Sequence, residues 1–143
     1  MKRRNGRQEA IREIVRTKSI KTQAALVEEL HSQDYACTQA TVSRDIADMG
    51  LRKLPEGIYV LAEDLHLQRM LSEFVVSVAC SANLVVVTCQ PGTASDVAAA
   101  LDDANLTHLL GSVPGNNKVL MVVDDAANAP ELSGLIEKLG SVR

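Results

Sequence analysis

The apolar positions in the first sixty residues recur at helical spacing. Ile11, Ile14 and Val15 stand three and four residues apart, which predicts one apolar face on a helix that begins near Arg7 and ends near Thr17. Residues 1–6 are polar and basic, and we expect them to form a mobile arm.

A second helix is predicted after Thr22, a residue type that favours the N-cap position, because Ala25, Leu26 and Leu30 follow at helical spacing. We expect this helix to end near Gln33.

A third helix is predicted between Thr38 as N-cap and Gly50 as C-cap. Its apolar face consists of Val42, Ile46 and Met49. Two strand-like runs follow, at 51–54 and 58–61, around the turn signal of residues 55–57. Three helices and a hairpin are the outline of a winged helix-turn-helix.

The second half mixes both periodicities and ends with a repeated strand–strand–helix order. Apolar runs that predict strands alternate with helical segments, which indicates an α+β domain with one antiparallel sheet and two helices. The expected elements are a helix at 64–74, strands at 75–80 and 84–89, a helix at 94–104, strands at 109–113 and 119–123, and a helix at 130–139. We therefore predict a winged helix-turn-helix domain at 1–64, a linking helix at 65–74 and a separate α+β domain at 75–143.

Composition adds two points. Aromatic residues make up 2% of the chain, so the cores must be built from aliphatic side chains, and association between subunits is a plausible way to bury more apolar surface. Residues 1–62 carry a net charge of +3 and residues 63–143 one of −6, and a basic head suggests a polyanionic partner.

Several classes of protein find no support in the pattern. No apolar run approaches the length of about 20 residues that a membrane span needs, and we expect a cytoplasmic protein without a membrane partner. The three cysteines and three histidines have no metal-ligand spacing, and no pairing of a nucleophile with a base indicates an enzyme or a cofactor.

The third helix carries the strongest functional signal, because short polar side chains lie opposite its apolar face. A helix that reads DNA needs such groups near its N-terminus, together with a cation that contacts guanine or phosphate. The candidates are Thr38, Gln39, Thr41, Ser43 and Arg44. From the pattern alone, a solvated helix face explains these residues equally well.

Phosphate contacts are expected from cations outside this helix. Lys53 stands in the predicted wing, and Arg3 and Arg4 stand in the basic arm. Such contacts position a protein on DNA without selecting a sequence.

The segment Thr38–Asp45, TQATVSRD, closely resembles the recognition helix of bacterial arginine repressors. The resemblance extends upstream to Ile20–Leu26 and, in the second half, to the segments at 90–94 and 110–115, in one collinear order. It implies that residues 1–64 bind DNA and that residues 75–143 form an oligomerisation and effector-binding domain. It also implies a hexamer built as a dimer of trimers, palindromic operators of arginine-metabolism genes as double-stranded DNA partners, and free arginine as a co-repressor bound between trimers.

The effector motif departs from that family's pattern. The family follows its Gly-Thr-Ile-Ala-Gly turn with two aspartates, whereas this chain has two asparagines and then a lysine. The candidate effector residues are Ser95, Asp102, Ser112, Pro114, Asn116, Asn117 and Lys118.

An aspartate-to-asparagine change removes the charge that a guanidinium needs, so we expect arginine to bind weakly. Three explanations stay open: the pocket binds another small metabolite, Lys118 supplies its own cation and replaces the ligand, or the pocket has decayed in a partner subunit of a mixed oligomer. An arginine-independent paralogue or an activator of arginine catabolism is the alternative function.

Overall fold

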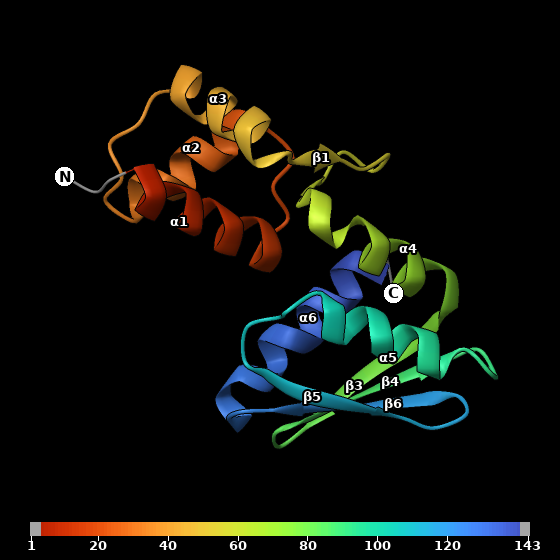
Figure 1. The fold of residues 1–143 in the computed structure, drawn as a ribbon. Coiled ribbons are helices and arrows are strands. Elements are labelled where there is room, and N and C mark those ends of the chain that lie inside the picture. Colours follow the sequence, from red (N-terminus) through yellow and green to blue (C-terminus); the bar gives the residue numbers. More distant parts are fainter. Residues whose placement is uncertain (1–3, 141–143) are drawn as a thin grey trace. The chain divides into compact units, whose positions relative to one another are not determined.

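The computed structural model describes residues 4–140 of the 143-residue chain. The chain divides into two compact units, Met1–Ala62 and Glu63–Arg143, called here the first and second unit. Figure 1 shows helices and a short hairpin in the first unit, and a sheet with helices on one face in the second. The prediction of a mixed α+β fold with antiparallel sheets is confirmed.

The first unit consists of three helices and a hairpin: α1 (Arg4–Thr17), α2 (Gln23–Ser32), α3 (Gln39–Met49), β1 (Arg52–Lys53) and β2 (Tyr59–Val60). The predicted caps are confirmed. The hydroxyls of Thr22 and Thr38 accept hydrogen bonds from backbone N–H groups at the starts of α2 and α3. Gly50 ends α3 in the left-handed conformation, with φ 68°, which a residue without a Cβ adopts at no steric cost.

Two expectations about the first unit are wrong. The helix α1 begins at Arg4 and not at Arg7, so residues 4–6, which were expected in the arm, are helical; residues 1–3 of the expected arm lie outside the described residues. The hairpin strands have two residues each, whereas four were expected. Leu51 and Leu61 are buried in the core, and Leu54 and Ile58 flank the turn, where the Leu54 N–H donates to the Ile58 carbonyl. That core is closed by aliphatic side chains from all three helices.

The second unit opens with a 3₁₀ turn, η1 (Ala62–Asp64), whose first residue still belongs to the first unit. Its sheet consists of β3 (Val75–Ser81), β4 (Leu84–Cys89), β5 (Leu109–Pro114) and β6 (Lys118–Val123), all antiparallel in the order β3-β4-β6-β5. Its helices are α4 (Leu65–Phe74), α5 (Ala94–Asp103) and α6 (Ala129–Gly140), and the turn η2 (Ala126–Asn128) precedes α6.

One face of this sheet is covered. The helix α5 packs on β5 and β6, α6 packs on β3 and β4, and α4 lies against α5 and α6 (Figure 1). Alternate residues of the central strands, such as Val85, Val87, Val119 and Met121, are fully buried on this side.

The opposite face of the sheet carries no helix in the part of the chain that the structure describes. Strand register places Val113, Leu120 and Val86 in one row across it. Leu110 and Val113 are 70% and 60% exposed, and Val76 and Leu120 are exposed as well. We call this surface the open sheet face.

Candidate nucleic-acid interface and effector site

The polar candidates of α3 lie together at the surface. Gln39, Ser43 and Arg44 are exposed, while Val42 on the other side is completely buried. Arg44 is the one Lys or Arg in the sequence of this helix. The helix therefore presents a polar side with a single full positive charge, as a helix in the major groove must.

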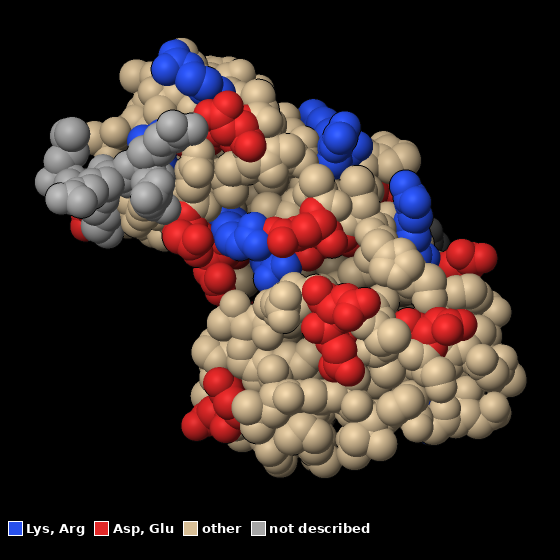
Figure 2. Space-filling model, viewed as in Figure 1, with Lys and Arg blue, Asp and Glu red and all other residues tan. Residues whose placement is uncertain are grey.

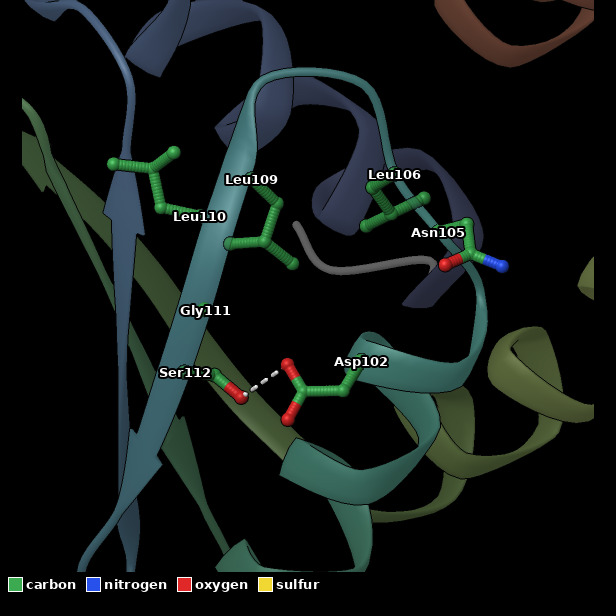
Figure 3. Close-up of a pocket in the computed structure, with 7 residues that line it drawn as sticks. All are labelled: Asp102, Asn105, Leu106, Leu109, Leu110, Gly111 and Ser112. Carbon is green, nitrogen blue, oxygen red and sulfur yellow. Dashed lines mark hydrogen bonds between the residues drawn. The ribbon is translucent and has the colours of Figure 1, made fainter.

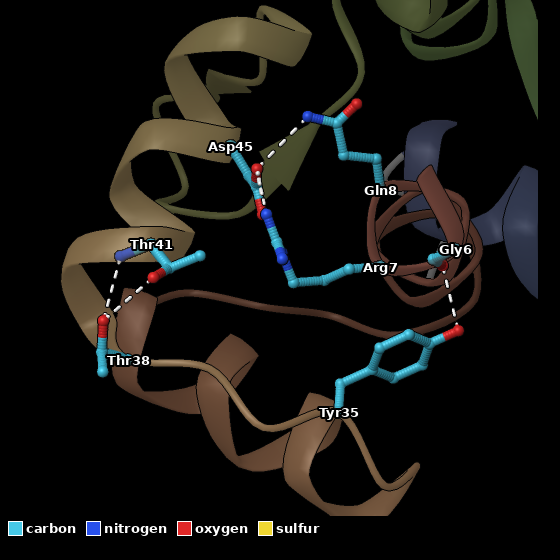
Figure 4. Close-up of polar contacts among 7 residues, drawn as sticks. All are labelled: Gly6, Arg7, Gln8, Tyr35, Thr38, Thr41 and Asp45. Carbon is cyan, nitrogen blue, oxygen red and sulfur yellow. Dashed lines mark hydrogen bonds and ion pairs between the residues drawn. The ribbon is translucent and has the colours of Figure 1, made fainter. Parts of the chain in front are cut away.

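The start of α3 is held by two threonines. The Thr38 hydroxyl accepts the backbone N–H of Thr41 at 3.2 Å and lies 3.0 Å from the Thr41 hydroxyl (Figure 4). These two predicted residues thus fix the first turn, and the remaining free N–H groups of the turn can donate hydrogen bonds to a phosphate oxygen.

The predicted cation of the wing lies at the surface of β1. The Lys53 ammonium stands 5.3 Å from the centre of the Tyr59 ring, which holds the side chain over the hairpin. Its neighbour Arg52 is exposed too and was not among the residues predicted from the sequence, although both residues of this two-residue strand are charged.

Most of the predicted basic arm lies outside the residues that the structure describes. Arg3 precedes the described residues, and Arg4 is the first residue of α1. On the face drawn in Figure 2, Lys and Arg side chains occur among acidic ones over the first unit, whereas the charged side chains seen over α5 and the sheet of the second unit are acidic.

The helix α3 also carries a buried charge, Asp45, which was not predicted from the sequence. Asp45 is 1% exposed and receives hydrogen bonds from Arg7 and Gln8 of α1 (Figure 4). The pairing joins residues 38 positions apart, so no local pattern indicates it.

In the second unit, two predicted effector residues meet. The Ser112 hydroxyl of β5 donates to the Asp102 carboxylate of α5 at 3.0 Å (Figure 3). Both line an open pocket between the end of α5 and the start of β5, together with Asn105, Leu106, Leu109, Leu110 and Gly111. These other five residues of the pocket were not among those predicted from the sequence.

The turn between β5 and β6 holds three other candidates apart from this pocket. Its backbone is tied to the segment after β4, because the carbonyls of Asn116 and Asn117 accept the N–H groups of Gly92 and Cys89. Pro114 ends β5 and is exposed. Among the described residues, neither asparagine side chain has a protein hydrogen-bond partner, so both amides are available to a ligand.

Lys118 points away from the pocket. It pairs in register with Thr88 and donates to that hydroxyl at 3.1 Å, on the open sheet face. Ser112 instead bonds to α5 on the covered side, so the lysine cation and the Asp102 carboxylate stand on opposite faces of the sheet. Ser95, in the first turn of α5, is exposed and does not line the pocket around Asp102.

Other chemistry is sparse. Cys37, Cys80 and Cys89 are free thiols, and burial raises the pKa of Cys37 and Cys89. Residues 4–140 contain no group of His, Cys, Asp and Glu side chains arranged to hold a metal ion. Within the same range, every helix is too short or too polar to cross a membrane.

Comparisons with known proteins agree with this arrangement. The model of the arginine repressor DNA-binding domain matches residues 2–67, and that of the arginine repressor C-terminal domain matches residues 71–138. The arginine repressor of Desulfitobacterium hafniense is 40% identical over 93% of this chain and 96% of its own length. The arginine repressor of Solibacter usitatus is 38% identical over 92% and 95%, and that of Halothermothrix orenii 34% identical over 88% and 91%. The chain therefore belongs to the arginine repressor family of DNA-binding regulators.

Proposed function

We propose that this chain represses genes of arginine metabolism by binding double-stranded operator DNA in the cytoplasm, as a regulator and not as an enzyme. One observation carries the proposal. The helix α3 buries its apolar side in the core and exposes the polar residues of the family signature, with Arg44 as its single cation.

The first unit acts as a winged helix-turn-helix. The helix α3 enters the major groove, where Arg44 contacts a guanine or clamps a phosphate, and Gln39 and Ser43 contact base edges. Lys53, Arg3 and Arg4 add phosphate contacts, which fix the position of the head without selecting a sequence.

The second unit assembles the subunits. The open sheet face exposes four large aliphatic side chains in the described part of the chain, a surface that a second copy would remove from water. A trimer or hexamer formed in this way links several heads, so that weak contacts add through effective concentration and the assembly occludes the promoter.

The effector pocket centres on Asp102 and Ser112. The Asp102 carboxylate holds one cationic group of a ligand, and the amides of the exposed Asn116 and the half-buried Asn117 contribute neutral hydrogen bonds from a neighbouring part of the assembly. Such a site holds arginine weakly, because a guanidinium is bound best by paired carboxylates.

The turn between β5 and β6 favours a second function, because Asn116 and Asn117 stand where the family has acids. These two amides support a paralogue that responds to another small metabolite. They also support one that works without arginine, either in a mixed oligomer or as an activator of arginine catabolism. The orientation of Lys118 toward Thr88 argues against the explanation that this lysine supplies its own cation and replaces the ligand.

The deciding experiment is a selection of duplexes from a random-sequence pool by the full chain, followed by gel shifts with Arg44→Ala. We expect one palindromic sequence to be enriched and the variant to lose it, by at least a hundredfold, since one base contact contributes about 1–3 kcal/mol in every head. A pool without enrichment, or unchanged affinity of the variant, would contradict the proposed function.

A further inference from the structure

The first turn of α1 and the middle of α3 share a buried ion pair. The guanidinium of Arg7 donates twice to Asp45, with 2.5 Å from Nε to Oδ2 and 3.0 Å from Nη2 to Oδ1. The side-chain amide of Gln8 donates to the same carboxylate at 3.2 Å. Figure 4 shows Asp45 pointing from α3 toward these two side chains.

A second contact holds the same turn of α1. The Tyr35 hydroxyl, from the connection between α2 and α3, donates to the Gly6 carbonyl at 3.0 Å. The start of α1 is therefore attached both to α3 and to the segment that leads into it. We call the Arg7–Asp45 pair the clamp.

Burial makes the clamp unusual. The Asp45 side chain is 2% exposed and that of Arg7 15%, so both charges have lost most of their hydration. Buried ion pairs are often no more stable than apolar residues of similar size, and their best-attested use is to fix one arrangement among several. A geometric role therefore accounts for the clamp better than stability does.

The arrangement that it fixes is the rotation of α3. Asp45 directly follows Arg44, and successive side chains point about 100° apart around a helix. Anchoring Asp45 to α1 sets the direction of Arg44, Gln39 and Ser43. The same bonds occupy the guanidinium of Arg7, whose pKa is raised chiefly by its hydrogen bond to Asp45, so this cation is held away from DNA phosphates.

We propose that Asp45 is a positioning residue for sequence recognition: through the clamp it sets the rotation of the recognition helix and keeps Arg7 from binding DNA non-specifically. This inference rests on the proposed function of α3, since it concerns how well α3 separates one DNA sequence from another.

The test uses the full chain with Asp45→Asn and two duplexes: the sequence that the wild-type protein enriches from a random pool, and a shuffled duplex of the same composition. All measurements are made where circular dichroism shows full folding. We expect affinity for the enriched duplex to fall at least tenfold. Affinity for the shuffled duplex stays equal or rises, with a salt slope steeper by about one per head, because Arg7 is released toward phosphate.

The matched control is Glu29→Gln, which breaks the exposed Lys18–Glu29 pair between the end of α1 and α2 and leaves α3 untouched. Its discrimination between the duplexes should equal that of the wild-type protein. Arg7→Lys keeps the charge but loses the two-pronged geometry, and should show a smaller loss of discrimination. If Asp45→Asn does not fold, the inference is tested with Arg7→Lys, by the ratio of its affinity for the enriched duplex to its affinity for the shuffled duplex.

The double variant Arg7→Met, Asp45→Leu separates positioning from stability. It should melt near the wild-type temperature and still discriminate poorly. The inference is overturned if discrimination is unchanged in the variants, or if both affinities fall by one common factor. If the wild-type protein itself enriches no sequence, the proposed function fails instead, so the two failures are distinguishable.

Discussion

The two units of this chain bury the same kinds of aliphatic side chain but leave different surfaces. The first unit closes its core within one chain and exposes polar groups and cations, including Arg44 and Lys53. The second covers one face of its sheet and leaves Leu110 and Val113 exposed on strand β5. The comparison indicates a head suited to a polyanion and a body suited to copies of itself.

The units also differ in how closely they keep the family pattern. The head retains the whole signature TQATVSRD, whereas the turn between β5 and β6 has asparagines where the family has acids. The ligand-binding turn thus differs from the family pattern while the DNA-reading signature does not, and the following experiments test the two regions separately.

The largest effect should come from charging the open sheet face. The double variant Val113→Asp, Leu120→Asp places carboxylates in one row of that face, where a second copy would bury them unpaired. We expect monomers in sedimentation velocity and a loss of about 10²–10⁴ in operator affinity, because the heads no longer act together.

The control for this variant is Thr107→Asp, which adds a charge at an exposed position in the connection between α5 and β5. It should assemble normally. An oligomer that survives the double substitution would show that another surface holds the subunits.

The second experiment restores the family's acids. Asn116→Asp with Asn117→Asp should raise arginine affinity on the order of ten- to a thousandfold, since a charge-assisted hydrogen bond contributes about 1.5–3 kcal/mol and a neutral one about 1. Calorimetry on both proteins measures the change.

Gln33→Glu is the matched control, because it changes an exposed amide to an acid in the first unit, outside both the turn and the pocket of Asp102, and it should leave arginine affinity unchanged. Micromolar arginine binding by the unmodified protein, with a clear gain in operator affinity, would contradict the prediction of weak arginine binding and would show that this protein depends on arginine.

A smaller effect is expected from the cations that contact phosphate. Lys53→Ala, Arg3→Ala and Arg4→Ala should each weaken all duplexes alike and reduce the salt slope by about 0.9 per lost contact in each head. Lys18→Ala, which removes a cation paired with Glu29, should leave the slope unchanged. An altered sequence preference would show that these side chains contact bases.

The smallest effect concerns pH and the second unit. Burial lowers the pKa of Lys138 from its ordinary 10.5 to about 8, despite the opposing effect of Asp64. Between these two pH values the unfolded chain binds the proton and the folded chain does not, so stability rises with pH. After allowance for solvent screening of this partly exposed group, we expect a rise of about 1 kcal/mol.

The measurement is the difference in denaturant unfolding between the wild-type chain and Lys138→Met from pH 7.5 to 10. Taking the difference cancels the titration of the thiols, whose raised pKa values act in the opposite direction. A flat difference curve would mean that the ammonium is well hydrated in the folded protein.

The sequence by itself determined the features that depend on neighbours along the chain. Threonine hydroxyls reach the N–H groups three residues on, and a glycine takes the left-handed conformation, so Thr22, Thr38 and Gly50 marked the ends of α2 and α3 correctly. A continuous apolar run gave β4 its bounds, Leu84–Cys89, and the residue pattern singled out Arg44.

Only the tertiary structure decided which distant groups meet. The Asp45 carboxylate lies on the core side of α3 because Arg7 and Gln8, almost forty residues earlier, satisfy it. Lys118 turns to the open sheet face because strand pairing places Thr88 beside it. Hydrogen bonds of this kind depend on how whole elements pack, and a buried charge is stable only where packing brings its partner, so no local pattern of residues contains them.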